Sequence, residues 1–345
     1  NCTTIEIKGD SLDDIFETGR KISKSASYRQ GLGVDISPLR PKNAMINNSA
    51  IISNDGSIGW MKWFDNIGNH VGQRGRIPAM LFSISISHPD VIDFIHVKSN
   101  LHAVQNANIS VQISDSFMRA FEKDEDWLLY FKVEGTREEI KVNIKAKELM
   151  KMIAEEANKF GEPGIQFIDL CKKESVTEVL GFPVKSTNAC SEKVMYPDST
   201  CVLLSINIGK FKSKNYEDEL ASISESCVRF LDNVVEYELQ YKKSPYKEQA
   251  YVISQLREIG CGITNLHAWL LKQNLSYDDD KAIKKTEEFI KKYSYYCWNS
   301  SIKLGKEKGN CLAFDREKIL NSVFIQRIIS EFPDLKFETL RNSQI

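Results

Sequence analysis

Short apolar segments alternate with helical segments through the first part of the chain, and this alternation limits the fold more than any other feature of the sequence. The predicted strands are residues 3–8, 31–37, 79–87, 108–113 and 165–168. The predicted helices are about 12–28, 60–71, 114–121 and 147–159, with another that opens at His88-Pro89-Asp90. Strands that alternate with helices predict an α/β fold, and short apolar strands suit burial on both faces of a sheet. A parallel barrel and a doubly wound sheet both satisfy this pattern.

The later part of the chain has a different pattern. Residues 210–345 are mostly helical, with predicted helices at about 214–240, 246–273, 278–305 and 315–331. The stretch 42–57 is polar and rich in Asn, which predicts a loop. We find no internal repeat and no low-complexity segment. The length and composition allow one large domain or two smaller ones.

The charge balance excludes several classes of partner. Lys and Arg number 46 and Asp and Glu number 47, so no overall field attracts the chain to nucleic acid or to an anionic membrane. No apolar run in the sequence is long enough to span a bilayer. We therefore expect neither a nucleic-acid partner nor a membrane partner, and a phosphate-bearing ligand must be held by local geometry.

Eight cysteines are scattered along the chain without a C-x-x-C pair, at positions 2, 171, 190, 201, 227, 261, 297 and 311. This pattern predicts a reducing cytoplasm with mostly free, buried thiols, where a disulfide is more often catalytic than structural. The segment Asn1–Ile5 resembles neither a signal peptide nor a transit peptide, and it has the pattern of the middle of a strand. We therefore expect the chain to be an internal piece of a longer cytoplasmic protein.

One short segment carries the clearest chemistry. Asn188, Cys190 and Glu192 occupy alternate positions, so on an extended loop their side chains would project the same way. An amide, a thiol and a carboxylate around one ligand suit a reaction in which the thiol acts on a carbon while a base removes a hydroxyl proton. A buried free thiol is the common alternative for any single cysteine, and a solvated carboxylate is the alternative for Glu192.

Two other cysteine chemistries fit the sequence poorly. A zinc site needs four ligands, usually in close pairs, and the five scattered histidines have no matching cysteine spacing. A cysteine-protease dyad needs a base within hydrogen-bond reach of the thiol, and none of the histidines lies in a recognisable context for that role. We therefore predict no metal site.

The sequence around Cys190 resembles a known family. Asn188-Ala189-Cys190-Ser191-Glu192 is similar to the N-x-C-x-E finger loop of the large, catalytic chain of ribonucleotide reductase. Further segments resemble signatures of the same family in the same order: residues 9–15, 31–41, 88–95, 108–111, 163–167 and 201–208. The ordered set covers nearly the whole chain, and this makes the resemblance specific.

The resemblance implies a fold and a reaction. The fold is a ten-stranded α/β barrel with the cysteine finger loop through its centre. Residues 1–345 would form a partial catalytic barrel domain, the N-terminal half to two-thirds of the barrel, with no separate second domain. The reaction is the reduction of ribonucleotides to 2′-deoxyribonucleotides for DNA synthesis. Cys190 would become a thiyl radical that abstracts the 3′ hydrogen, Glu192 would take the 3′-hydroxyl proton, and Asn188 would bind the ribose hydroxyls.

The resemblance also implies a redox pair. The matching cysteines are Cys2 and Cys201, which would lie on neighbouring strands and end each turnover as a disulfide. A thioredoxin-like or glutaredoxin-like reductant would then reduce this disulfide. Gly31 and Gly33 lie in a segment that resembles a family signature, and the resemblance assigns them to substrate binding. The substrate would be a ribonucleoside di- or triphosphate.

An effector site follows from the same resemblance. Asp10 and Ser11 match the segment that contacts a deoxynucleoside triphosphate effector in the family. Arg40 and Lys98 belong to the corresponding loops, at about 40–49 and 98–108. The alternatives from the residues alone are a strand-ending turn for Asp10 and a surface salt bridge for Arg40. The family resemblance also allows a homodimer.

The radical source remains open between two classes. The eleven-residue spacing from Cys190 to Cys201 resembles the adenosylcobalamin-dependent class II enzymes. Their finger loop is usually N-P-C-G-E, whereas Ala189 and Ser191 replace Pro and Gly here, and residues 74–79 interrupt the usual R-R-G-A. The alternatives are a class I large subunit, which takes its radical from a metal-containing small subunit, and an inactive nucleotide-binding regulatory fragment. Because the chain stops before the expected Pro-Thr-Gly segment, we expect it to be inactive alone.

Overall fold

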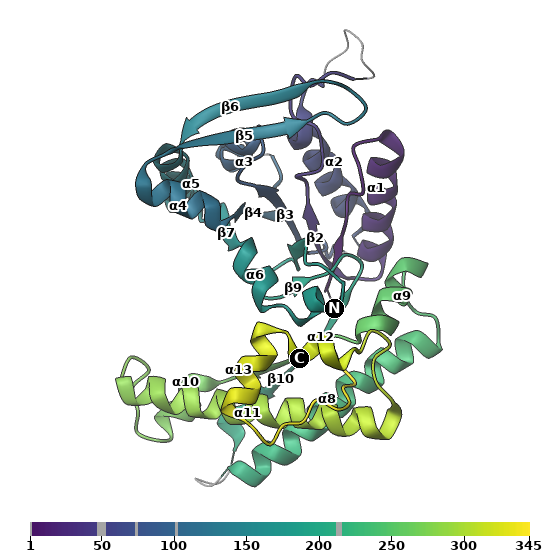
Figure 1. The fold of residues 1–345 in the computed structure, drawn as a ribbon, viewed down its shortest axis with the longest axis vertical. Helices are drawn as coiled ribbons and strands as arrows, with labels where there is room; N and C mark the ends of the chain where they lie inside the picture. The colour runs from purple at the N-terminus through teal and green to yellow at the C-terminus, as the bar shows by residue number, and fades with distance from the viewer. Residues whose placement is uncertain (1, 47–52, 73–74, 101–102, 212–215) are drawn as a thin grey trace. The chain divides into compact units, whose positions relative to one another are not determined.

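The structure is a computed structural model, and it describes residues 2–46, 53–72, 75–100, 103–211 and 216–345 (Figure 1). The chain packs as two compact units, Asn1–Lys173 with Pro183–Asp198 and Glu174–Phe182 with Ser199–Ile345. The single domain predicted over residues 1–345 stays a prediction.

A parallel sheet forms the centre of the first unit. In spatial order its strands are β1 (Cys2–Ile5), β2 (Gly31–Asp35), β3 (Met80–Ser85), β4 (Ala107–Ile113) and β7 (Gly164–Phe167). Every neighbouring pair of these strands is parallel, and the register places Leu32 beside Met80 and Met80 beside Ala107. These strands confirm the five predicted from the sequence, with slightly shifted ends.

Helices connect these strands, and two of them begin where side chains cap them. They are α1 (Leu12–Ser27), α2 (Gly56–Val71), α3 (Val91–Ile95), α4 (Asp115–Lys123), α5 (Ala146–Phe160) and α6 (Ile168–Glu174), with the 3₁₀ helix η1 (Val97–Ser99). Ser11 Oγ accepts a hydrogen bond from the Asp14 backbone N–H at 3.1 Å, and Ser114 Oγ accepts one from Phe117 at 3.2 Å. Both are N-caps that stabilise the first turn of a helix. Helix α2 begins before its predicted start at Trp60, and part of the predicted loop, residues 47–52, lies outside the described residues.

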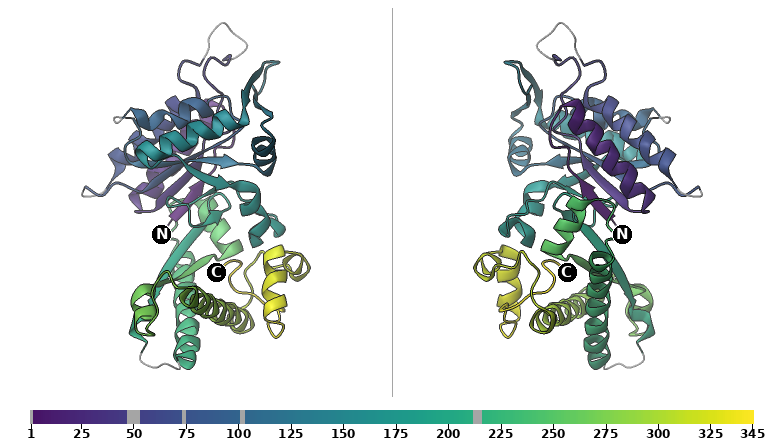
Figure 2. Two further views of the ribbon diagram at one scale, coloured as in Figure 1. Left: turned by 90° about the vertical axis from the view of Figure 1, so that its left-hand side faces the viewer. Right: turned by 90° about the vertical axis from the view of Figure 1, so that its right-hand side faces the viewer.

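The sheet of the first unit has two chemically different faces. Leu32, Val34 and Phe82 are fully buried in the hydrophobic cluster that includes residues of α1 and α2. These two helices lie on one face of the sheet (Figure 2). Because side chains alternate along a strand, Gly33 and Ser83 face the other way. The second face therefore has little side-chain volume at β2 and a polar group at β3.

The sequence analysis missed an antiparallel hairpin in the first unit. It consists of β5 (Asp126–Lys132) and β6 (Glu139–Lys145), paired from Asp126 with Lys145 to Lys132 with Glu139. Polar and apolar residues alternate along β6, and along β5 Leu129 is buried whereas Leu128 is exposed. This alternation is typical of a ribbon with one covered face, and it was the signal available in the sequence.

The second unit is mostly helical, as predicted. Its strands β10 (Thr200–Asn207) and β11 (Ile259–Thr264) are parallel. Its helices are α7 (Val176–Val179), α8 (Glu217–Gln240), α9 (Lys247–Leu256), α10 (Leu266–Leu271), α11 (Asp280–Lys308), α12 (Arg316–Leu320) and α13 (Val323–Glu331), with the 3₁₀ helix η2 (Ile208–Lys210). Leu231, Ile259 and Phe289 share one core cluster. None of the described helices has the length and apolar character needed to cross a membrane.

The predicted helix at 246–273 is wrong, because the segment contains a strand. Helix α9 ends at Arg257, whose φ of 49° lies in the left-handed region. After Glu258, the six residues Ile259–Thr264 pair with β10 as β11. Two glycines in this segment disfavour a helix, and its β-branched residues favour a strand. The predicted helix at 315–331 is likewise two helices, α12 and α13.

A buried carboxylate joins distant parts of the second unit. Asp232 on α8 is fully buried, and its Oδ1 accepts hydrogen bonds from Arg257 Nη2 at 2.7 Å and from Arg341 Nε at 3.1 Å. Lys308 Nζ lies 3.4 Å from the other oxygen. One carboxylate therefore balances cations from the end of α9, the end of α11 and the C-terminal segment.

We predict that Asp232→Asn lowers the free energy of unfolding by about 3 kcal/mol, because the buried guanidinium groups lose their buried counter-charge. They keep the half-exposed carboxylate of Glu236, which lies 3.0 Å from Arg257 and 2.9 Å from Arg341. Urea denaturation of the purified protein measures this change. Glu307→Gln is the matched control, since Glu307 forms an exposed pair with Arg229 at 2.6 Å and exposed pairs contribute little. Equal effects of the two substitutions would contradict the structural role of Asp232.

Candidate active site

Cys190 lies in the turn of a short β-hairpin. Strands β8 (Ser186–Thr187) and β9 (Val194–Met195) are antiparallel, with Ser186 opposite Met195. The Ser191 N–H donates to the Asn188 carbonyl at 3.1 Å, and the Asn188 N–H donates to the Lys193 carbonyl at 3.1 Å. The extended conformation predicted for residues 188–192 is therefore wrong, because these backbone bonds close a tight turn.

The hairpin lies against the second face of the sheet, and the glycines of β2 make room for it. A methyl group on the Cα of Gly33 would overlap the carbonyl oxygen of Thr187. A methyl group on Gly31 would lie 3.3 Å from the Cβ of Ala189. Gly31 and Gly33 were predicted to bind substrate, and that role stays a prediction. The structure shows that both lie directly beneath the hairpin.

Side chains and backbone groups of the sheet fix the hairpin base. Thr4 Oγ1 donates to the Tyr196 carbonyl at 3.0 Å, and Gln112 Nε2 donates to the Lys185 carbonyl at 3.0 Å. The hydroxyls of Ser83 and Ser186 lie 3.2 Å apart. Strands β1, β3 and β4 therefore each contribute a contact to the hairpin.

Asn188 and Glu192 lie together, as predicted, but they bind each other. Asn188 is fully buried, and its Nδ2 donates to Glu192 Oε1 at 2.5 Å. Its Oδ1 accepts from the Lys193 N–H at 3.1 Å. The carboxylate of Glu192 is exposed. The amide therefore holds the carboxylate at the base of the turn, and a ligand would have to share or replace this hydrogen bond.

Cys190 is exposed, and its surroundings keep it protonated. Partial burial, the charge of Glu192 and the Cys2 thiol raise the pKa of the Cys190 thiol. An ordinary cysteine is already mostly protonated at neutral pH, so this thiol retains its hydrogen. The turn therefore presents an accessible S–H group next to a carboxylate.

Cys2 belongs to the same unit and faces the same region. A methyl group on Gly31 would lie 3.0 Å from Cys2 Sγ, on the side where Ala189 also packs. Cys201 is fully buried in β10 of the second unit. The disulfide between Cys2 and Cys201 stays a prediction.

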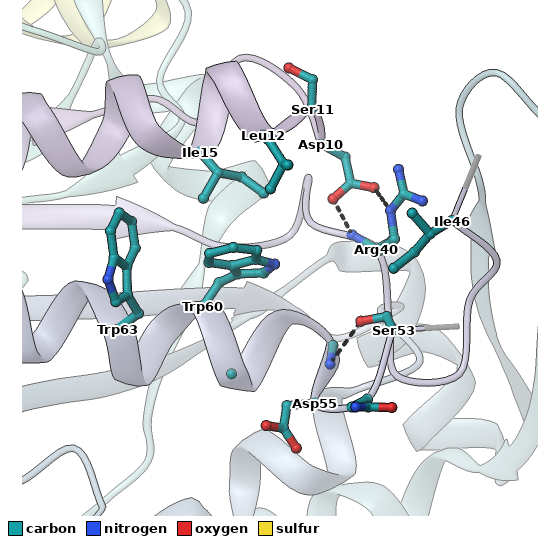
Figure 3. A pocket seen from close by; sticks show the side chains of 13 residues that line it. Asp10, Ser11, Leu12, Ile15, Arg40, Ile46, Ser53, Asp55, Trp60 and Trp63 are labelled. Carbon is teal, nitrogen blue, oxygen red and sulfur yellow. Dashed lines mark hydrogen bonds and ion pairs between the residues drawn. The ribbon is translucent and has the colours of Figure 1, made fainter. Parts of the chain in front are cut away.

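Three of the four predicted effector residues line one cavity. Asp10, Ser11 and Arg40 contribute to a cavity of about 710 Å³ that Trp60 and Trp63 of α2 also line (Figure 3). Asp10 accepts hydrogen bonds from the backbone N–H of Arg40 at 3.0 Å and from its Nε. Burial raises the pKa of Asp10, although the bonds and charge of Arg40 lower it.

Lys98 does not line this cavity. Its ammonium donates to the carbonyls of Val104 and Ala107 at 2.7 and 2.6 Å and pairs with Glu162 at 3.0 Å. Lys98 therefore holds the following segment of chain in place. Parts of the two predicted effector loops, residues 47–49 and 101–102, lie outside the described residues.

Sequence reasoning missed the side-chain amides that contact the hairpin. Asn108 and Gln112 of β4 and Gln166 of β7 each donate a hydrogen bond to it. Asn108, Ser110 and Gln112 alternate with apolar residues, so β4 carries one polar face. This alternation within a buried strand was the signal available in the sequence.

Comparisons with known proteins identify the family. The family model "Ribonucleotide reductase, barrel domain" matches residues 1–343, so the chain belongs to this family. The match confirms the predicted family and its α/β barrel class. It also selects the barrel over the doubly wound sheet.

Several curated relatives cover most of the chain. It is 29% identical over 87% of its length to the vitamin B12-dependent ribonucleoside-diphosphate reductase of Thermoplasma acidophilum, and 26% identical over 93% to the enzyme of that name from Mycobacterium tuberculosis. It is 27% identical over 90% to the ribonucleoside-diphosphate reductase subunit alpha of Enterobacteria phage T4. The chain spans only 39%, 46% and 45% of these relatives' lengths.

We predict that Gly33→Ala destabilises the protein by about 1–3 kcal/mol, because the added methyl group forces the backbone of Thr187 to move. Chemical denaturation measures the loss. Gly31→Ala is the matched comparison, since the atoms nearest to its added methyl group are side-chain atoms at 3.0 and 3.3 Å, and we expect a smaller effect. A larger loss for Gly31→Ala would contradict this account of how the hairpin is seated.

Proposed function

We propose that this chain is part of the catalytic barrel of a vitamin B12-dependent ribonucleotide reductase, and that Cys190 carries its radical chemistry. The observation that supports this most directly is the hairpin turn itself. It presents an accessible thiol beside the hydrogen-bonded pair Asn188 and Glu192. The family match over residues 1–343 and the names of the relatives support the reaction class.

The residues of the turn have distinct roles in this reaction. Cys190 gives up the hydrogen atom of its thiol and then takes the 3′ hydrogen of the ribose. A raised thiol pKa supports this role, because a hydrogen atom can leave only from the protonated form. Glu192 accepts the 3′-hydroxyl proton, and Asn188 orients Glu192 and the ribose hydroxyls. The hydrogen bond of 2.5 Å between Asn188 and Glu192 keeps this base in place between turnovers.

Cys2 and Cys201 form the redox pair in this proposal. Loss of the 2′-hydroxyl as water consumes two electrons, which the pair supplies as it becomes a disulfide. A thioredoxin-like or glutaredoxin-like protein then restores the thiols. The substrate is a ribonucleoside di- or triphosphate.

One property of Cys190 supports a cobalamin cofactor. The thiol is exposed and protonated at the end of a turn, so a large planar group can approach it. When bound, adenosylcobalamin supplies the radical that removes the thiol hydrogen. In this proposal, the thiol of Cys190 is the group that would face the cofactor.

We predict that the natural gene product containing this chain reduces ribonucleoside diphosphates only when adenosylcobalamin and a dithiol are present. Cys190→Ala removes the hydrogen donor, so turnover falls by at least about 10³-fold. Cys171→Ala, at a half-buried thiol of α6, is the matched control and keeps turnover. Turnover that requires a metal-containing small subunit instead would favour the class I alternative. Nucleotide binding without turnover would favour the regulatory alternative.

The cavity at Asp10 supports a second part of the proposal, an effector site for a deoxynucleoside triphosphate. Arg40 offers a guanidinium for phosphate, and the indoles of Trp60 and Trp63 offer surfaces for a base. Asp10 holds Arg40 at the edge of this cavity (Figure 3). Lys98 acts through the segment it anchors.

We predict that Arg40→Leu weakens dTTP binding at least about tenfold, because charge-assisted hydrogen bonds to phosphate are lost. Quenching of tryptophan fluorescence reports binding, since Trp60 and Trp63 line the cavity. Arg20→Leu is the matched control. Arg20 lies on α1, the helix that lines the cavity with Leu12, but it pairs with Glu17 and does not line the cavity itself. Equal affinities for the Arg40→Leu variant and the unaltered protein would exclude this site.

A further inference from the structure

Strand β7 buries its polar residue and exposes its apolar ones. Gln166 is 5% exposed, whereas its neighbours Ile165 and Phe167 are 40% and 46% exposed. Burial of an amide is unfavourable unless it is hydrogen-bonded. The amide nitrogen of Gln166 is hydrogen-bonded, whereas its Oε1 is buried without a hydrogen-bond partner in the described part of the chain, so the contacts of the nitrogen are the ones that favour this position.

Both partners belong to the turn that carries Cys190. Gln166 Nε2 lies 2.8 Å from Thr187 Oγ1 and 3.1 Å from Ser191 Oγ. The two hydroxyl oxygens lie 3.2 Å from each other, so the three polar groups close a triangle. Thr187 precedes the turn and Ser191 follows Cys190, so one side chain of β7 joins both ends of the turn.

A second amide holds the residue before Cys190. Asn108 Nδ2 of β4 donates to the Ala189 carbonyl at 3.1 Å. The residues on either side of Cys190 are therefore bound by side chains of two adjacent strands. Gln112 of the same strand binds the hairpin base at Lys185 instead.

These contacts stabilise an unfavourable backbone conformation at Ser191. Its φ of 63° lies in the left-handed region, where a residue other than Gly is disfavoured by about 1–2 kcal/mol. Glycine adopts this conformation freely. Here the hydroxyl of Ser191 is bound by Gln166, which stabilises the strained turn.

From this geometry we infer that Gln166, assisted by Asn108, is a positioning residue that fixes the Cys190 thiol through Ser191 and Ala189. The inference rests on the proposed function. A displacement of about 1 Å in a reacting group can reduce a rate about 100-fold, so the position of the thiol matters more for kcat than for substrate binding. Side chains of β4 and β7 therefore stabilise the conformation of the turn in addition to the hydrogen bonds within the turn itself.

The test compares Gln166→Leu with Thr18→Val in the natural gene product. Both remove a buried polar group, but Thr18 donates to the Asp14 carbonyl within α1 and does not touch the hairpin. We expect Gln166→Leu to lower kcat about 10- to 100-fold with KM nearly unchanged, and Thr18→Val to keep both. Asn108→Leu, at an exposed position, should lower kcat in the same way if Gln166→Leu fails to fold. Unchanged kcat in both hairpin variants would overturn the inference.

Ser191→Gly distinguishes positioning from general stability. Glycine removes the strain that Gln166 offsets, so Gln166→Leu should lower kcat less in the Ser191→Gly background than in the unaltered protein. Strictly additive losses of kcat in the double variant would contradict a role through Ser191.

A readout that does not need turnover separates this inference from the proposed function. We measure the rate of alkylation of Cys190 relative to that of Cys171 in folded protein. We expect this ratio to rise several-fold in Gln166→Leu, which loosens the turn, and to stay constant in Thr18→Val, which does not. If the unaltered protein does not reduce ribonucleotides, the proposed function fails, and the alkylation rates still decide whether Gln166 holds the turn. Equal alkylation rates in all three proteins would refute the inference.

Discussion

The close approach of the Thr187 carbonyl to Gly33 is the constraint on which the candidate site depends. A side chain at Gly33 would occupy the space of this carbonyl, so the hairpin can lie on the sheet only because β2 has no side chain there. The opposite face of the same strand is filled by Leu32 and Val34, which pack in the core with the helices. Strand β2 thus packs large apolar side chains on one face and has no side chain at Gly33 on the other.

Polar groups of the sheet bind the hairpin in the space that the glycines of β2 leave. The second face of the sheet carries hydroxyls and amides, such as Ser83 and Gln112, and these meet the backbone and side chains of the hairpin. Satisfied buried polar groups fix one geometry more strictly than apolar contacts, because a shifted hairpin would leave donors and acceptors unpaired. The Cys190 thiol at the end of this hairpin has a defined position while it remains exposed.

Local signals in the sequence were sufficient for most of the fold. The capping residue Ser11 and the apolar periodicity located α1 and the strands, since these depend on residues near one another in the chain. The turn at Cys190 could not be predicted in this way, because its conformation depends on Gly33 and on amides from β4 and β7. Strand β11 is short and lies between two helices, α9 and α10, so it was included in one long predicted helix although its glycines and β-branched residues favour a strand. The resemblance named the reactive residues, but not what holds them.

The contacts that seat the hairpin also affect the order of folding. Thr4 and Tyr196 are 192 residues apart in the sequence, and Asn108 and Ala189 are 81 apart. Contacts between distant residues form slowly, because much of the chain must be ordered before they can close. The hairpin can therefore dock only on a sheet that is already assembled, which makes it a late step. During synthesis, the Cys190 thiol would then have no fixed position until the sheet that binds the hairpin is complete.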